Sequence, residues 1–384
     1  MRQLQILIKP VSSACDLRCR YCFYQDEAKH RQAGNRGRMS LQTARILIDK
    51  ALGESEECVF GFQGGEPLLA GLEFYEAFTS YAEACKKPGQ RIFYTMQTNG
   101  MLLDESWMNF FKRKEFLVGI SVDGVRRTHD ENRIDASGNG TFSQVFENVK
   151  KLQGQKIPFH ILCVLTAQTA KRIEAVYRFF VRKGFYGQQY IPCLDKLEHE
   201  ACRGKESYSL TPKLYGEALC RLFDMWFQDV TSGVPVSIRQ FENYVLMLQG
   251  AQPEACAMYG RCSMQNVIEA DGTVYPCDFY ALDAYEMGNI RDEDVDFQKL
   301  FLQAEAGMRE KGVLKNPCQG GAAFFREADR RDERCCSCRW YPLCRGGCRR
   351  DCFQNKGRYE NYYCLAYQEF FAHAIEHLEW LAAR

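Results

Sequence analysis

The sequence of 384 residues predicts an α/β protein in which a partial, open (β/α)6 barrel of the TIM type is followed by a cysteine-rich domain. Apolar segments typical of strands alternate with helical patterns over residues 1–195, which indicates βαβ units and a parallel sheet. Eleven of the 20 cysteines then crowd into residues 256–384. Six strand–helix units are too few for a closed barrel of eight, and a doubly wound sheet is the alternative.

Each expected strand is a short apolar segment, and a polar or glycine-rich turn follows most of them. The expected strands are 3–9, 58–62, 91–97, 116–122, 159–166 and 186–193, and the helices between them are 40–52, 71–86, 104–114, 141–153 and 171–183. Ser40 is a plausible N-cap of the first helix. We expect the functional face at the carboxyl ends of the strands, where the polar residues gather. No Gly-x-Gly-x-x-Gly turn follows a strand, so a dinucleotide site is not supported.

After residue 195 the alternation of strands and helices ends. Two longer helices are expected, at about 211–230 and 238–249. The break Ser232-Gly233-Val234-Pro235 separates them and indicates a domain boundary near residue 234. The expected domains are the barrel, residues 1–233, and the cysteine-rich domain with a C-terminal helix, residues 234–384.

The composition argues against several classes of protein. Lys and Arg number 50 and Asp and Glu 49, so the net charge of +1 gives no reason to expect nucleic acid or an anionic membrane as a partner. No stretch reaches the roughly 18 unbroken apolar residues of a membrane span. Polar residues interrupt the first ten residues, which do not resemble a signal peptide. We therefore expect a cytoplasmic protein, in which 20 cysteines indicate metal binding rather than disulfides.

The motif Cys15-x3-Cys19-x2-Cys22 places three thiolates on the loop after the first expected strand. Three thiolates can hold three irons of a cubane cluster, whereas the usual protein-bound cluster takes four cysteines. The next cysteine is distant, at Cys58, so one iron would stay open to an external ligand. Structural zinc or chance clustering is the alternative, although three thiolates make an incomplete structural zinc site.

This motif resembles the signature Cys-x3-Cys-x-aromatic-Cys of the radical S-adenosylmethionine (radical SAM) enzymes, with Tyr21 as the aromatic residue. The resemblance implies that the open iron chelates the amino and carboxylate groups of SAM. Gln63-Gly64-Gly65-Glu66-Pro67 resembles the family's GGEP element, where a bare strand edge and the glutamate meet the SAM amino group. The SAM contacts that the resemblance implies are Tyr21, Gln63, Gly64, Gly65, Glu66, Thr98, Asn99, Ser121, Asp123 and Arg133. Ordinary turn or loop residues are the alternative at each position.

A second cysteine pattern follows in the C-terminal part: Cys262, nine residues, Gly272, four residues, Cys277, then Cys335-x2-Cys338-x5-Cys344-x3-Cys348 and Cys364. It resembles the SPASM extension of radical SAM enzymes, and Cys256 supplies an eighth thiolate, enough for two four-cysteine clusters. The resemblance implies one auxiliary cluster on Cys256, Cys262, Cys277 and Cys348 and another on Cys335, Cys338, Cys344 and Cys364. A zinc ribbon on Cys335, Cys338, Cys344 and Cys348 is the alternative.

Some residues near this pattern have no assigned role. Cys318, Cys336 and Cys352 are left over. Because Cys336 and Cys352 lie close along the chain to the expected ligands Cys335 and Cys348, either of them could take the place of its neighbour as a ligand. Three arginines surround Cys348, and they either offset the negative charge of the clusters or form a solvated basic face. These are Arg345, Arg349 and Arg350.

The whole chain resembles the anaerobic sulfatase-maturating enzymes, in the segments YCFY (21–24), ILCVLT (161–166), CLD (193–195), VYPCDFY (274–280), CRGGCRRD (344–351) and NYYC (361–364). The resemblance implies oxidation of a cysteine or serine to Cα-formylglycine, within a Cys/Ser-x-Pro/Ala-x-Arg segment of an unfolded sulfatase. It also implies three [4Fe–4S] clusters, SAM and a low-potential electron donor of the flavodoxin or ferredoxin type. Asp278 would be the proton acceptor, and Tyr24 and Leu194 would face the substrate.

Three other functions compete with this one. Another SPASM-type peptide maturase would form thioethers or crosslinks, but such enzymes commonly carry an extra N-terminal peptide-binding domain, and we expect none because only 14 residues precede Cys15. A ferredoxin-like electron carrier would need neither six strand–helix units nor an incomplete three-cysteine site. A zinc-stabilised binding module would contain zinc in place of iron and sulfide.

Overall fold

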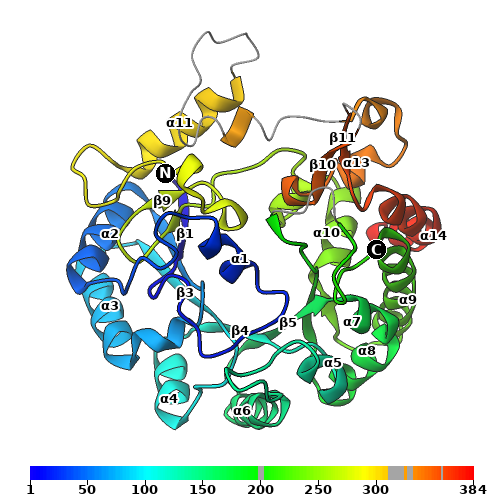
Figure 1. Ribbon diagram of the computed structural model, residues 1–384, viewed down its shortest axis with the longest axis horizontal. Coiled ribbons are helices and arrows are strands. Elements are labelled where there is room, and N and C mark those ends of the chain that lie inside the picture. Colours follow the sequence, from blue (N-terminus) through cyan, green and yellow to red (C-terminus); the bar gives the residue numbers. More distant parts are fainter. Residues whose placement is uncertain (198–202, 310–323, 327–331, 356–357) are drawn as a thin grey trace.

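The computed structural model describes residues 1–197, 203–309, 324–326, 332–355 and 358–384. Its strands lie in the order β7-β6-β5-β4-β3-β2-β1-β8-β9 and curve around the molecule (Figure 1). The first six strands are parallel and keep the order of the chain. They are β1 (Gln3–Ile8), β2 (Glu57–Phe62), β3 (Arg91–Thr98), β4 (Leu117–Ser121), β5 (Phe159–Leu165) and β6 (Gly187–Pro192). A doubly wound sheet reverses its strand order partway, so the expected partial barrel is confirmed and that alternative is wrong.

Helices cover the outer face of this sheet (Figure 1). Four of them match the expected ranges: α2 (Leu41–Glu54), α3 (Leu72–Cys85), α4 (Glu105–Arg113) and α6 (Phe142–Gly154). The hydroxyl of Ser40 accepts a hydrogen bond from the Thr43 N–H at 3.0 Å, which confirms Ser40 as the N-cap of α2. In α2 the buried side chains recur at helical spacing and face the sheet, so this packing stabilises the helix.

The sequence analysis did not predict three short helices of the barrel. α1 (Phe23–Lys29) begins directly after the third clustered cysteine, and α5 (Arg126–Asp130) follows β4. The helix expected at 171–183 is α8 (Ile173–Arg182), and the short helix α7 (Ala167–Lys171) precedes it. Helices of five to seven residues make at most two turns, so apolar periodicity does not reveal them.

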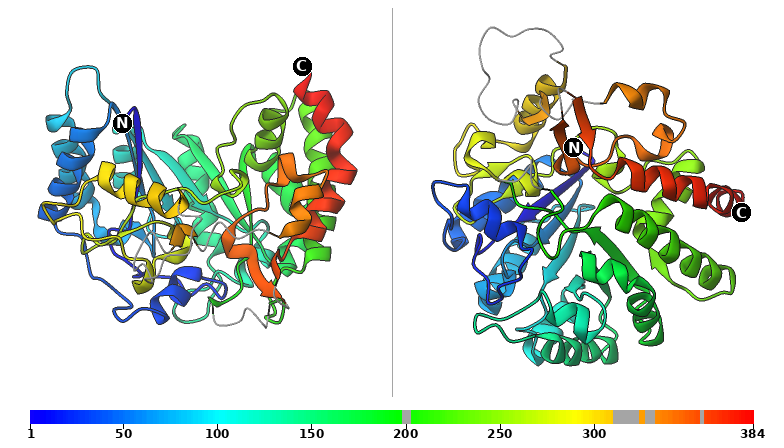
Figure 2. Two further views of the ribbon diagram at one scale, coloured as in Figure 1. Left: turned by 90° about the horizontal axis from the view of Figure 1, so that it is seen from above. Right: turned by 45° about the vertical axis from the view of Figure 1, so that its right-hand side comes forward.

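Segments after residue 234 extend the sheet at both of its edges. These strands are β7 (Ser237–Ile238), β8 (Val267–Ile268) and β9 (Val274–Tyr275). The helices in this part of the fold are α9 (Pro212–Thr231), which ends before residue 234, α10 (Arg239–Leu248) and α14 (Cys364–Ala382). β7 lies parallel to β6, whereas β8 lies parallel to β1 and antiparallel to β9. α14 packs against α9 and α10, beside the barrel (Figure 2). The domain boundary near residue 234 stays a prediction.

The cysteine-rich region consists of short elements. Its helices and strands are α11 (Phe297–Arg309), α13 (Tyr341–Cys344), β10 (Cys352–Asn355) and β11 (Arg358–Asn361). The 3₁₀ turns in the described part of the chain include Pro67–Ala70, Cys256–Met258, Asp278–Tyr280, Asp283–Tyr285, Glu333–Ser337 and Arg349–Asp351. Among the helices that the structure describes, none combines the length and apolarity needed to cross a membrane.

Candidate active site

The first three clustered cysteines lie between β1 and α1, at the carboxyl end of the barrel strands. Cys15, Cys19 and Cys22 are half-buried, and their sulfur atoms are close enough that a negative charge on one disfavours ionisation of the next. Burial raises the pKa of Cys19 to about 12, and the pKa values of Cys15 and Cys22 are also raised by burial. A metal replaces the thiol protons when it binds. These three thiolates therefore suit a four-iron cluster that the protein binds through three of its irons.

The GGEP element holds the cysteine loop in place. The Gly65 N–H donates to the Ser12 carbonyl at 2.9 Å and the Glu66 N–H to the Ala14 carbonyl at 2.7 Å. A Cβ atom at Gly65 would lie 2.0 Å from the Ala14 carbonyl oxygen, so only glycine allows this approach. The strand edge expected to be bare is therefore paired with the cysteine loop at these two N–H groups.

Glu66 links this loop to the end of β3. Its carboxylate is fully buried and accepts hydrogen bonds from the Thr98 hydroxyl and the Asn99 N–H, both at 2.8 Å. Burial raises the pKa of Glu66 to about 7, and these hydrogen bonds oppose the rise. The Asn99 side chain donates to Asp16 at 2.7 Å and lies 3.8 Å from the Cys15 sulfur. These residues therefore position the cysteine loop, and their contacts with SAM stay predictions.

Asp123 and Arg133 form a buried ion pair behind the cysteine loop. Arg133 Nε lies 3.0 Å from Asp123 Oδ2, and the Tyr21 hydroxyl donates to the same oxygen. The second oxygen accepts from the Val164 N–H at 2.9 Å. The guanidinium of Arg133 favours the thiolate of Cys19 electrostatically. Both oxygens of Asp123 are thus bound within the chain, and its expected contact with SAM stays a prediction.

Ser121 and Leu194 lie at the carboxyl ends of β4 and β6. The Ser121 hydroxyl accepts a hydrogen bond from the Gln97 side chain at 3.0 Å, so neighbouring strands hold it at the rim. Leu194 lies two residues after the end of β6 and is half-buried. Among the described contacts, none joins the Leu194 side chain to Tyr24 or Asp278, and its role in substrate binding stays a prediction.

Tyr24, Gln63 and Asp278 meet in one hydrogen-bonded group. The Tyr24 hydroxyl donates to Asp278 Oδ2 at 2.7 Å, and Gln63 Nε2 lies 2.7 Å from that hydroxyl and 2.6 Å from the same carboxylate oxygen. Burial and the charge of Asp278 raise the pKa of Tyr24, so its hydroxyl stays protonated and donates. The structure brings Gln63 to the two residues expected at the substrate, and its expected contact with SAM stays a prediction.

Lys9 is a member of this group that the sequence did not reveal. It follows the last residue of β1, and its Nζ lies 3.1 Å from Asp278 Oδ1. The only signal in the sequence is a charged residue directly after a buried strand, six residues before Cys15. Such a position belongs to the functional face of a barrel, but a lysine there is equally an exposed loop residue.

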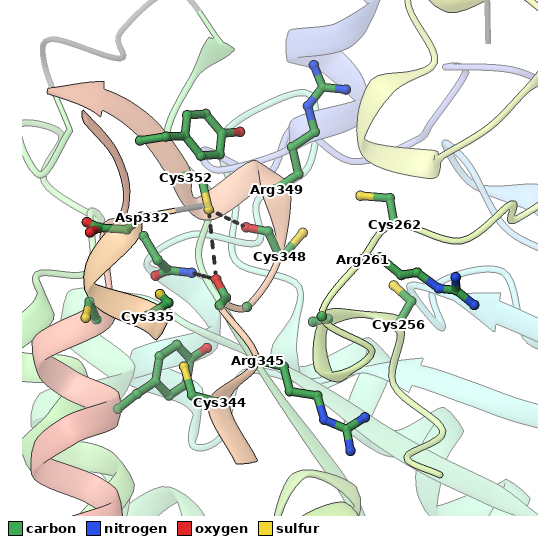
Figure 3. A pocket seen from close by; sticks show the side chains of 18 of the residues that line it. Cys256, Arg261, Cys262, Asp332, Cys335, Cys344, Arg345, Cys348, Arg349 and Cys352 are labelled. Carbon is green, nitrogen blue, oxygen red and sulfur yellow. Dashed lines mark hydrogen bonds between the residues drawn. The ribbon is translucent and has the colours of Figure 1, made fainter. Parts of the chain in front are cut away.

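The eight cysteines of the C-terminal part form two groups. The thiol of Cys348 interacts electrostatically with Cys256, Cys262 and Cys277, whereas that of Cys344 interacts with Cys335, Cys338 and Cys364. All eight line one hollow. The volume of this hollow is about 1340 Å³ when the part that is open to solvent is included. Figure 3 shows Cys256 and Cys262 on one side of this hollow and Cys335 and Cys344 on the other.

These groupings match the ligand sets that the resemblance implies and suit two four-thiolate clusters. A zinc ribbon would need Cys348 beside Cys344, yet Cys348 lies with the other group. Within the described part of the chain, no three His, Cys, Asp or Glu side chains converge tightly enough to hold a single metal ion. A four-iron cluster is larger than one ion and needs its thiolates farther apart.

The remaining cysteines and arginines around this hollow are placed differently. Cys336 is exposed, Cys352 donates to the Cys348 carbonyl at 3.4 Å, and Cys318 lies outside the described residues. Arg350 is buried and donates to the Asp195 carbonyl at 2.7 Å, so a solvated basic face is wrong for this residue. Arg349 lies 4.6 Å from the ring centres of both Tyr280 and Phe324 and favours the thiolate of Cys262.

One side chain connects the first of these groups to the carboxylate site. The Gln265 amide donates to the Cys256 sulfur at 3.4 Å, and its oxygen accepts from the Asp278 N–H at 2.9 Å. Asp278 also directly follows Cys277 in the chain. The carboxylate site therefore lies between the two groups of cysteines. Cys22 of the barrel motif is two residues before Tyr24, and Cys277 directly precedes Asp278.

Comparisons with known proteins agree with this arrangement. Residues 10–180 match the radical SAM superfamily, and residues 256–344 match the SPASM iron–sulfur cluster-binding domain. The chain is 41% identical to a cysteine-type anaerobic sulfatase-maturating enzyme of Clostridium novyi (strain NT), over 100% of this chain and 98% of the relative. The cysteine-type enzyme of Clostridium perfringens (strain 13 / Type A) is 39% identical, over 98% of each. Native anSMEcpe with bound AdoMet and Kp18Cys peptide has a TM-score of 0.89 and 39% identity, over 99% of each chain.

Proposed function

Because the chain belongs to the anaerobic sulfatase-maturating enzymes of the radical SAM superfamily, we propose that it oxidises a cysteine in a Cys-x-Pro-x-Arg segment of an unfolded sulfatase to Cα-formylglycine. The observation that carries this proposal is the contact of Tyr24, Gln63 and Asp278 between the barrel cysteines and the Cys277 group. The names of the two relatives and the cysteine peptide in the related structure favour cysteine over serine as the target.

The reaction needs a radical, a proton acceptor and an electron acceptor. Cys15, Cys19 and Cys22 would hold a cluster that, with bound SAM, would supply a 5′-deoxyadenosyl radical for removal of a hydrogen atom from the β-carbon of the target. The substrate radical must then lose one proton and one electron, which leaves a thioaldehyde, and hydrolysis by water forms the aldehyde and releases the sulfur as hydrogen sulfide. Asp278 accepts the proton, while Tyr24 and Gln63 orient its carboxylate through Oδ2. The SPASM cysteines would hold two further clusters beside this site, and these clusters would provide the acceptor for the electron.

The most direct test is oxidation of a short peptide. With anaerobically reconstituted protein, SAM and a reductant, a peptide of roughly 15–20 residues carrying Cys-x-Pro-x-Arg should yield formylglycine, read by mass spectrometry. A peptide with serine at the target position tests the preference for cysteine, and one with alanine should not react. A product that keeps its sulfur in a thioether would contradict the proposal and favour the other type of SPASM maturase.

We expect the substrate to be bound in an extended, unfolded form, because the target side chain must reach a carboxylate that is 8% exposed at the mouth of the barrel. The short peptide should therefore be oxidised, and a folded sulfatase of the same target sequence hardly at all. Rates are compared at equal concentrations, with the heat-unfolded sulfatase as the control. Equal rates on the folded sulfatase and the peptide would contradict this prediction.

We further propose that a low-potential flavodoxin or ferredoxin supplies the electron that starts each turnover, and that the protein works in the cytoplasm. A reducing compartment keeps thiols available for iron, which suits a chain with 20 cysteines. Among the 18 cysteines that the structure describes, all are free of disulfides.

A further inference from the structure

Lys9 is a buried cation in direct contact with the proposed proton acceptor. Its side chain is 1% exposed, its Nζ lies 3.1 Å from Asp278 Oδ1, and the same atom lies 4.8 Å from the ring centre of Tyr24. Burial of an ammonium group is costly unless opposite charges surround it. Retaining a lysine at this depth therefore calls for an explanation beyond packing.

The surroundings of Lys9 supply those charges. Glu27 and Glu269 lie 3.5 and 3.8 Å from its Nζ, and Arg31 lies 3.4 Å from Glu27 and 2.6 Å from Glu269. Burial lowers the pKa of Lys9, but the three carboxylates outweigh it and raise that pKa, so the ammonium stays charged. Glu27 and Glu269 already have Arg31 as a partner, whereas Asp278 has Lys9 as its nearest cation among the described residues.

The two oxygens of Asp278 differ in what they contact. Oδ2 accepts hydrogen bonds from both Tyr24 and Gln63, which occupies its two lone pairs. Oδ1 receives no hydrogen bond from the described residues, and its contact with Lys9 is ionic. Oδ1 is itself buried, so among the described residues Lys9 is the side chain that holds this second oxygen.

We propose that Lys9 is a positioning residue of the reaction, which holds the Asp278 carboxylate in place beside Tyr24 and Gln63 while that carboxylate accepts the proton of the target. This inference rests on the proposed function. The proton moves from the target thiol to the Asp278 carboxylate, and Lys9 itself neither gives nor takes one. Tyr24 and Gln63 hold one side of the carboxylate and Lys9 the other, so removing Lys9 lets the group turn about its Cα–Cβ bond.

A purely structural role for Lys9 is the competing explanation. Lys9 joins β1 to α1 through Glu27 and to the segment after β8 through Glu269, so its loss leaves buried carboxylates without a counter-charge. The variant Lys9→Met alone does not separate the two roles, because it is expected to destabilise the fold. The double variant Lys9→Met/Glu27→Gln removes one cation and one carboxylate together, and it restores the balance of charge without restoring a partner for Asp278.

The test measures oxidised peptide per 5′-deoxyadenosine formed, together with KM, iron content and thermal unfolding. The double variant should keep its iron and its 5′-deoxyadenosine formation, while oxidised peptide per 5′-deoxyadenosine falls about 10- to 100-fold at little change in KM, since a misplaced catalytic group can cost about 100-fold. Glu27→Gln alone, the matched control, should keep the wild-type ratio.

Three outcomes are decisive. A double variant with the wild-type ratio would overturn the inference, because Lys9 would then only balance charge. The inference would also be overturned if Glu27→Gln alone lowered the oxidised peptide per 5′-deoxyadenosine as much as the double variant does. A wild-type enzyme that oxidises the peptide to another product would overturn the proposed function alone, since the same ratio still measures the role of Lys9.

Discussion

Replacing Cys15, Cys19 and Cys22 together with alanine should abolish SAM cleavage and remove about one third of the iron. Three four-iron clusters hold about twelve irons in the reconstituted protein, and the triple variant keeps the eight thiolates of the SPASM region. Without the barrel cluster, SAM has neither an anchoring iron nor an electron donor within reach. Iron and sulfide analysis and chromatography of 5′-deoxyadenosine measure the two effects.

Cys220→Ala is the control for this variant. Cys220 is half-buried on α9 and lies outside both groups of the SPASM region and the barrel motif, so its loss should change neither iron content nor SAM cleavage. Stoichiometric zinc with little iron in anaerobically purified protein would show that the cluster assignment is wrong. Unchanged iron in the triple variant would show that these cysteines bind no cluster.

Replacing Asp278 with asparagine should separate SAM cleavage from substrate oxidation. Asparagine keeps the size and can still accept a hydrogen bond from Tyr24, but it cannot take up the proton of the target. The loss of a general base typically lowers the rate by about 10²–10⁴-fold. Formylglycine should fall by a factor in this range, while 5′-deoxyadenosine still forms and all three clusters remain.

Asp283→Asn provides a matched control five residues along the chain. Asp283 forms a half-exposed ion pair with Arg36, 3.2 Å away, and lies outside the hydrogen-bonded group of Tyr24, Gln63 and Asp278. This variant should oxidise the peptide at nearly the wild-type rate. Formylglycine at the wild-type rate in Asp278→Asn would make Asp278 an ordinary turn residue, and loss of iron would make it a support of the Cys277 group.

The sequence predicted the fold class and the family because their signals are local. Each strand and long helix carries its own apolar pattern, and the three barrel cysteines lie within eight consecutive residues. Iron ligation by such a motif needs only the right spacing on one loop. The same reasoning failed for α1, because seven residues after a cysteine are too few to show a helical period.

Contacts between distant segments were decided only by the tertiary structure. Gln63 is 215 residues from Asp278, and its place after Phe62 in the GGEP segment suggested SAM rather than the carboxylate. Lys9 reaches Asp278 because β8 pairs with β1 and brings the segment after β9 to the end of that strand. The sequence by itself thus determined the barrel, the cysteine motifs and the family, since each depends on neighbours along the chain. The tertiary structure decided which side chains surround the carboxylate, because this depends on which strands pair and on charges that only folding brings together.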